Sequence, residues 1–189
     1  MKSFDLKGTA RTEVGKKSTS ELRKNNGIPC VLYGIEKEAQ AFAVTTDAVR
    51  KLVYTPDIHL VNLTIDGKEC TAILKDIQFH PVKDTILHMD FLQVVADKPI
   101  VMEVPTVLNG LAAGVKLGGK LQQAIRKIKV KALYANIPEK LTVDVTELGL
   151  GKSIKVGDLA FENLELVTPA QTVVCSVAAT RASREAANK

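Results

Sequence analysis

The chain has 189 residues with a formal net charge of +5; 46% of them are hydrophobic and 25% are charged, which indicates a globular protein of one large domain or two of about 90 residues. Aromatic residues make up only 4% and tryptophan is absent, so the core must consist mainly of aliphatic side chains, whose β-branched members favour sheet. The charged N-terminus lacks the apolar run of a signal peptide and no stretch approaches the ~18 apolar residues of a membrane span, so we expect a cytoplasmic protein without a membrane partner.

In the first half of the chain, alternation of apolar and polar residues predicts strands, with two short helices between them. The predicted strands are 3–11, 28–34, 40–44, the hairpin 59–81 and 85–95, and the predicted helices are 15–27 and 45–55. Asp66–Gly67 is the preferred two-residue turn for the hairpin. We expect Thr45 or Thr46 to cap the second helix, whose apolar stripe comprises Ala48, Val49, Leu52 and Val53.

The helix at 15–27 differs from the second because it has almost nothing to bury. Ser18 and Glu21 have the S-x-x-E spacing of a capping box, in which each side chain satisfies a free backbone donor of the other. Asn26–Gly27 is a suitable helix stop. Leu22 is its only strongly apolar residue, so its basic face must look at solvent or at a partner.

After residue 95 the sequence changes to strands and turns with little helix. The stretch ADKP, residues 96–99, is the predicted linker between a first domain at 1–95 and an all-β second domain at 98–180, followed by a polar tail at 181–189. The predicted strands are 100–108, 126–133, 141–145, 153–159, 164–167 and 172–179. In 126–133 the side chains of Ile128, Val130 and Ala132 should face inward, and those of Lys127, Lys129 and Lys131 outward.

Several motifs that suggest chemistry have simpler explanations. Cys30, Cys70 and Cys175 are far apart among apolar neighbours, as expected of buried thiols rather than of disulfides or zinc ligands. Residues 114–121 and 146–153 imitate a phosphate-binding loop, but Leu121 and Thr146 break its pattern, and neither stretch lies between a buried strand and a long helix. We therefore expect turns there, with no metal and no cofactor.

The stretch FHPVKDTILHMDF, residues 79–91, holds two of the three histidines. In a strand, His88 and Asp90 share one face, whereas Leu87, Met89 and Phe91 share the apolar face that should be buried. A metal site lacks further ligands nearby, and a catalytic triad lacks a nucleophile in a recognisable pattern. An exposed face without function and a surface that recognises a partner by hydrogen bonds both remain open.

The distribution of charge favours a polyanionic partner. Residues 1–34 carry seven basic and three acidic side chains, for a net +4, whereas residues 35–97 are net −4 and residues 98–189 net +5. A basic helix beside His88 and Asp90 would supply both phosphate neutralisation and hydrogen bonds to base edges. A regular RNA helix has a major groove too narrow for a protein helix, so such binding implies a widened groove. A solvated charged face is the alternative.

Two segments, GKKSTSELRKNNGIPCVLYG and DIQFHPVKDTILHMDF, resemble the bacterial family of large-subunit ribosomal protein twenty-five, which binds 5S ribosomal RNA. The second half, with VPTVLNGLAAGVKLGGKL and IPEKLTVDVTELGLGKSIKVGDL, resembles the extra β domain of its long form, the general stress protein Ctc. The resemblance runs from about residue 3 to residue 180. It implies a mainly β fold with a few helices, in which a six-stranded β-barrel precedes a C-terminal all-β domain.

The resemblance also implies a function without enzymatic activity. The first domain would grip the loop E region of 5S rRNA, beside other components of the large subunit, as a monomer present once per ribosome. The implied RNA contacts are Arg11, Lys16, Lys17, Thr19, Ser20, Arg23, Tyr33, Lys75, His88 and Asp90. His80, in the turn before the last strand, is assigned a structural role.

Three positions depart from the family pattern. Ser20 and Glu21 stand where the family often has arginines, and Glu21 would repel phosphate unless it caps the helix through Ser18; Lys75 replaces a polar amide. The lysines at 127, 129 and 131 would either touch RNA or form a solvated strand face. Two alternatives remain for the whole protein, namely a stress protein that binds RNA off the ribosome and an enzyme built on His88, Asp90 or the glycine–lysine turns.

Overall fold

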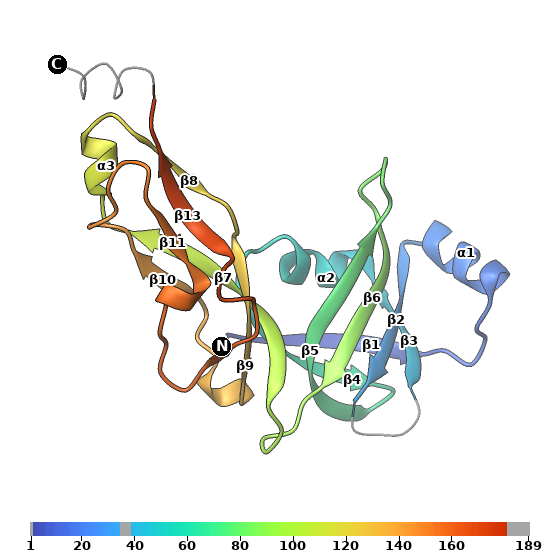
Figure 1. Cartoon of the computed structure of the whole chain (residues 1–189). Coiled ribbons are helices and arrows are strands. Elements are labelled where there is room, and N and C mark those ends of the chain that lie inside the picture. Colours follow the sequence, from blue (N-terminus) through green and yellow to red (C-terminus); the bar gives the residue numbers. More distant parts are fainter. Residues whose placement is uncertain (1, 35–38, 181–189) are drawn as a thin grey trace. The chain divides into compact units, whose positions relative to one another are not determined.

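The computed structural model describes residues 2–34 and 39–180, and the chain divides into two compact units, Met1–Lys98 and Pro99–Lys189. The first contains a closed six-stranded barrel and the second two small sheets (Figure 1). The predicted fold class is thus confirmed. The polar tail predicted at 181–189 lies outside the described residues.

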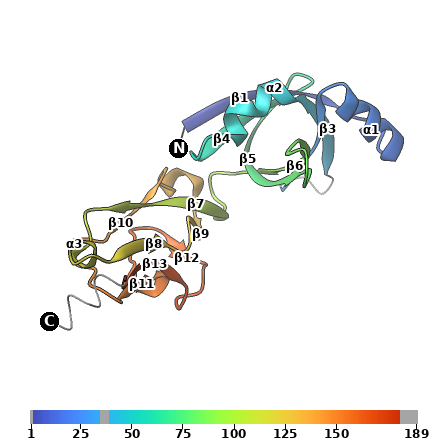
Figure 2. The ribbon, with the colours of Figure 1, turned by 90° about the horizontal axis from the view of Figure 1, so that it is seen from above.

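The barrel follows the order β1-β3-β2-β6-β5-β4. Its strands are β1 Lys2–Ala10, β2 Gly27–Tyr33, β3 Gln40–Thr45, β4 His59–Ile65, β5 Lys68–Phe79 and β6 Ile86–Gln93. Two of the pairings, β1 with β4 and β2 with β6, are parallel, and the others are antiparallel. Figure 2 shows how these strands curve into a ring.

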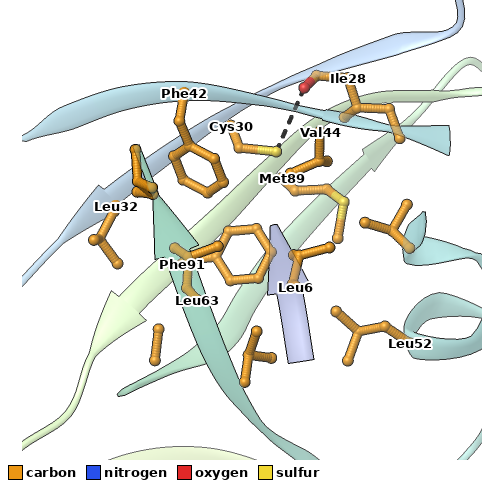
Figure 3. Close-up of a cluster of buried hydrophobic side chains, with 14 of the residues drawn as sticks. Leu6, Ile28, Cys30, Leu32, Phe42, Val44, Leu52, Leu63, Met89 and Phe91 are labelled. Atoms are coloured by element: carbon orange, nitrogen blue, oxygen red, sulfur yellow. Dashed lines mark hydrogen bonds between the residues drawn. The ribbon is translucent and has the colours of Figure 1, made fainter. Parts of the chain in front are cut away.

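The interior of the barrel is filled by aliphatic and aromatic side chains that alternate with outward polar ones. Phe42 and Phe91 are each 0% exposed and their ring centroids lie 5.6 Å apart, with Met89, Leu6 and Leu63 around them (Figure 3). Burying side chains of this size contributes about 1.5–3 kcal/mol each. This core holds the outward faces of β2, β5 and β6 in fixed positions.

Helix α2, Thr46–Val53, packs against β1 and β3, which pair with each other only at Thr9 and Ala10. It buries Val49 and Leu52. Ala48 was expected in the same stripe but is exposed, because it lies at the edge of the apolar arc. Of the two expected cap residues, Thr45 and Thr46, Thr45 is the N-cap residue, but its side chain makes no capping hydrogen bond.

The β4–β5 hairpin has the predicted two-residue turn. Asp66 and Gly67 both have positive φ, 47° and 86°, and Ile65 pairs with Lys68, which is the geometry of a type I′ turn. The Asp66 carboxylate also accepts a hydrogen bond from the backbone N–H of Ala10. The turn therefore also fixes the end of β1.

Helix α1, Lys16–Lys24, has no buried residue. The predicted capping box is wrong, because the N-cap is Gly15 and Ser18 lies inside the first turn. There its Oγ accepts from Arg11 at 3.3 Å and lies 3.4 Å from the Glu13 carbonyl oxygen. The predicted stop is confirmed, since Asn26 adopts φ 58°.

The second unit contains two sheets, β10-β7-β9-β12 and β11-β13-β8. The strands are β7 Ile100–Asn109, β8 Lys120–Gln123, β9 Lys127–Ala132, β10 Leu141–Asp144, β11 Ser153–Lys155, β12 Glu165–Leu166 and β13 Val173–Ala178. The short helices are α3 Ala113–Lys116, η1 Tyr134–Asn136 and η2 Val156–Asp158. The alternation predicted for β9 is confirmed, whereas β8 and α3 were not predicted and 156–158 is a 3₁₀ turn instead of strand.

Candidate nucleic-acid interface

One side of the barrel gathers most of the residues singled out from the sequence. β6 lies between β2 and β5, and α1 packs beside β2 (Figure 1). We call this side the α1/β6 face. It comprises Lys16, Thr19, Ser20, Arg23, Tyr33, Lys75, Asp76, Gln78, His88 and Asp90.

His88 and Asp90 point outward from β6, as predicted, while Met89 between them is 0% exposed. The His88 Nδ1 lies 2.7 Å from the Asp90 Oδ1, with side chains 26% and 34% exposed. The carboxylate accepts from Nδ1–H and so fixes the orientation of the ring. The pair offers a partner two carboxylate oxygens and the second ring nitrogen.

The expectation that Leu87 faces the core is wrong, because a β-bulge interrupts the strand. Gln78 pairs with His88 and Phe79 with Ile86, which leaves Leu87 as the extra residue. Ile86 occupies the core in its place, at 6% exposed. The bulge releases the Leu87 carbonyl from the sheet, and this oxygen accepts from Arg23 Nε at 3.1 Å and Nη2 at 2.8 Å.

Asp76 and Gln78 also belong to this face, although no motif in the sequence marks them. Asp76 is the direct partner of Asp90 across β5 and β6, and Gln78 is the partner of His88. Since opposite residues of an antiparallel pair share a face, all four point outward. Their alternation along β5, combined with the register of the hairpin, is the signal that would have found them. A second bulge makes Lys75 the extra residue between Leu74 and Asp76.

The electrostatics of the face centre on its two aspartates. Burial raises the pKa of the Tyr33 hydroxyl, and the charges of Asp90 and Asp76 raise it further. Burial, followed by the Asp90 charge, raises the pKa of the Cys30 thiol to about 12, against the opposing charge of Arg11. Cys30 thus stays protonated inside the barrel, where its thiol meets the Ile28 carbonyl oxygen (Figure 3). It is a poor nucleophile there.

The helix α1 presents its predicted contacts as a group. At about 100° per residue, four of them fall within an arc of about 100°. These four are Lys16, Thr19, Ser20 and Arg23. Glu21 is exposed and lies about 160° from Arg23 around the axis, so its carboxylate need not face a ligand of that arc. Lys17 lies on the Glu21 side and stands apart from the other predicted contacts.

Arg11 leaves the end of β1 and bonds to the start of α1. Its Nη2 donates to the Glu13 carbonyl oxygen at 3.2 Å and to the hydroxyls of Ser18 and Thr19 at 3.3 and 3.4 Å. A guanidinium carries five N–H donors, so Arg11 and Arg23 each retain donors beyond these bonds.

His80, the other histidine of the 79–91 stretch, has the structural role expected of it, because its hydrogen bonds stay within its own turn. The Nδ1 of its ring accepts from the backbone N–H groups of Val82 and Lys83, both at 3.2 Å. The backbone N–H of His80 donates to the Thr85 carbonyl oxygen at 2.8 Å. His80 organises the β5–β6 turn. Within residues 2–34 and 39–180, no group of three or more potential metal-ligating side chains is found.

Of the two stretches that imitate a phosphate-binding loop, the first, 114–121, is closely packed, whereas the second, 146–153, forms turns in which Gly151 has φ 72°. Gly114 lies within α3, and a Cβ there would lie 2.7 Å from the Gly149 carbonyl carbon; one at Gly119 would lie 2.5 Å from Val177 Cγ1. Close packing explains these glycines. In the described part of the chain no helix is long and apolar enough to cross a membrane.

On the second unit, two of the three outward lysines of β9 meet acidic partners across the sheet. Lys129 Nζ lies 3.9 Å from the Glu103 carboxylate and Lys131 Nζ 3.0 Å from that of Glu165. This pairing favours the solvated strand face over a second RNA surface.

Comparison with known proteins bears on the whole chain. Residues 6–91 match the Ribosomal L25p family and residues 99–181 match the family described as Ribosomal protein TL5, C-terminal domain. The large ribosomal subunit protein bL25 of Phocaeicola vulgatus is 62% identical over 193 residues, covering 99% of this chain and 98% of the relative. The chain belongs to the ribosomal L25p family.

Other members of the L25p family agree along their full length. The bL25 proteins of Porphyromonas gingivalis and Parabacteroides distasonis are each 57% identical, over 190 and 194 residues, covering 100% of this chain and 99% and 100% of the relatives. The resemblance drawn from the sequence is confirmed. The L25p family consists of ribosomal proteins and not of enzymes, which removes the alternative of an enzyme.

Proposed function

We propose that this chain is a structural component of the large ribosomal subunit, present once per ribosome, that binds the loop E region of 5S rRNA through the α1/β6 face. The observation that carries the proposal is the placement of the α1 cations and the His88–Asp90 pair on one side of one domain. The relatives that match the chain from end to end are named as proteins of the large subunit. The binding domain is residues 1–95, and the β domain at 98–180 is accessory.

Two kinds of contact would contribute to binding: contacts to phosphates, which position the protein on the RNA, and contacts to base edges, which distinguish one sequence from another. Lys16, Arg23 and Lys75 are exposed cations, which neutralise phosphates and release counterions. Base edges are then read by the polar groups of β6, because a carboxylate accepts from an exocyclic amino group. A regular A-form groove excludes a helix, so selectivity arises where non-Watson–Crick pairs widen the groove to admit α1.

The test is a salt titration of the full chain with a 5S loop E fragment, with a regular RNA duplex of equal length as control. Binding should be selective for the fragment, with log K falling linearly as log salt rises. Lys16→Gln should reduce that slope by roughly 0.7–0.9. The matched variant Lys17→Gln, about 100° around α1 from Lys16 and outside the arc of the other four residues, should reduce it less. Equal and weak binding of both RNAs would refute the proposed RNA site.

Place on the ribosome is tested separately. During normal growth, the chain should sediment with the large subunit and be lost from subunits that lack 5S rRNA. A chain that is absent from ribosomes in growing cells and appears only under stress would instead support an RNA-binding stress protein.

A further inference from the structure

The two glycine–lysine stretches, 114–121 and 146–153, are far apart in the sequence but meet at one end of the second unit. A Cβ on Gly114, within α3, would lie 2.7 Å from the carbonyl carbon of Gly149. The two stretches also flank the last residues of β13, because β13 lies between β8 and β11 (Figure 1). The fold therefore brings the lysines of both stretches to a common surface.

Three exposed lysines surround this end of β13. On one side of the strand, Lys120 pairs with Ala178. On the other side, the backbone N–H of Val177 donates to the carbonyl oxygen of Lys152 at 3.0 Å. Lys116 lies in the last turn of α3. We call the surface formed by Lys116, Lys120 and Lys152 the α3 end.

The lysines of the α3 end lack the acidic partners that other lysines of this unit have. On β9, Lys129 and Lys131 lie 3.9 and 3.0 Å from carboxylate oxygens. Within residues 2–34 and 39–180, none of the three lysines of the α3 end takes part in an ion pair. Glu147 is the one acidic residue of the two stretches, which leaves three positive charges against one negative. A bound anion would relieve the repulsion among these cations.

The backbone at the α3 end does not form the cradle of a nucleotide-binding loop. In such a loop, free N–H groups of the glycines surround the phosphates. Here the N–H groups of Gly118, Gly119 and Gly151 donate to carbonyl oxygens of the protein at 3.0, 2.9 and 2.9 Å. The groups left for an anion are the lysine ammoniums, each a point charge with three donors on a flexible stem. They suit the phosphates of a polymer and select no particular nucleotide.

We propose that the α3 end is a second RNA-binding site, which holds backbone phosphates through Lys116, Lys120 and Lys152 and reads no base sequence. The inference goes beyond the proposed function, because it assigns a ligand to the β domain and involves neither loop E nor the α1/β6 face. Lysine is depleted at protein–protein interfaces, whereas lysine–phosphate contacts supply the sequence-independent part of nucleic-acid affinity. Leu117, 63% exposed, makes an acidic protein the competing occupant.

The test uses the full chain and two triple variants that lose the same charge. The first carries Lys116→Gln, Lys120→Gln and Lys152→Gln. The matched control carries Lys127→Gln, Lys129→Gln and Lys131→Gln on β9. Urea unfolding of all three proteins checks that both variants remain folded.

The first measurement is a salt titration with a regular RNA duplex that lacks loop E. The α3-end variant should lower the slope of log K against log salt by about 2–3, at roughly 0.7–0.9 for each lost phosphate contact, and weaken binding about tenfold or more. The β9 control should lower the slope by less than about one. An unchanged slope for the α3-end variant would overturn the proposal. An equal fall in both variants would also overturn it, because net charge alone would then explain binding.

The second measurement locates the contact by amide hydrogen exchange with and without the duplex. In the original chain, the duplex should slow exchange in 114–121 and 150–153 and leave β9 unchanged. No protection in either stretch would overturn the proposal. If the α3-end variant binds the duplex normally but is washed from large ribosomal subunits at lower salt than the original chain, an acidic protein is the occupant and the RNA site is refuted.

The loop E fragment distinguishes this proposal from the proposed function. The α3-end variant should keep its preference for that fragment over the duplex, since the α1/β6 face is intact. Failure of the original chain to prefer the fragment would refute the proposed function. The duplex titration and the exchange experiment would still decide whether the α3 end binds RNA.

Discussion

Removal of the His88 side chain should weaken RNA binding and leave the fold almost untouched. The side chain lies on the outer face of β6 and is 26% exposed, so His88→Ala opens no core cavity. Its pair with Asp90 is partly exposed, and pairs of that kind contribute at most about 1 kcal/mol. By contrast, a hydrogen-bonding group that reads a base edge discriminates by about 1–3 kcal/mol, or roughly 5- to 150-fold in affinity.

The assay compares affinity for the loop E fragment and for a regular duplex, with urea unfolding alongside. His80→Ala is the matched control from the same hairpin, since His80 bonds to two backbone N–H groups of its own turn. His80→Ala should lower stability by about 1 kcal/mol and change affinity less than His88→Ala does. Equal loss on both RNAs, or a stability loss for His88→Ala larger than its loss in binding, would refute base reading by His88.

Three further predictions concern the scaffold. Phe91→Ala should cost about 3–5 kcal/mol in urea unfolding, because Phe91 is 0% exposed and packs on Phe42; a cost below 1 kcal/mol would contradict that packing. Cys30 should resist alkylation near pH 8 until the chain unfolds, because the pKa of its thiol is raised from 9.0 to about 12. Between these two pH values the folded state keeps the thiol proton that the unfolded state releases. The free energy of unfolding should therefore fall as pH rises from about 9 towards 12. Gly27→Ala should clash with Leu22 and cost about 1–3 kcal/mol, with faster exchange in α1 as the readout, and an unchanged α1 would show that Leu22 yields freely.

Local patterns in the sequence were enough to find most strands, and the reason is their two-residue period. The alternation of β9 and the Asp66–Gly67 turn each reflect a preference of a few adjacent residues. The partners of the strands do not follow from such preferences. The six-stranded barrel was expected only because of the family resemblance, and its parallel pairs β1–β4 and β2–β6 were not predicted.

The errors have the same physical origin. The capping box at Ser18 is compatible with its neighbours, but bonds from Arg11 and a start at Lys16 override it. The bulge at Leu87 depends on the register against β5, which the sequence of β6 does not contain. Asp76 was not predicted as part of the face for the same reason, since it becomes a neighbour of Asp90 only when β5 and β6 pair.

The bond between Arg23 and Leu87 can form only some time after Arg23 has been synthesised. The two residues are 64 positions apart, and at about 5–20 residues per second that length takes roughly 3–13 seconds to synthesise. During this interval the nascent chain carries the cationic residues of α1 without β6. If the α1/β6 face is the RNA site as proposed, it is complete only after β6 has left the exit tunnel and the barrel has closed.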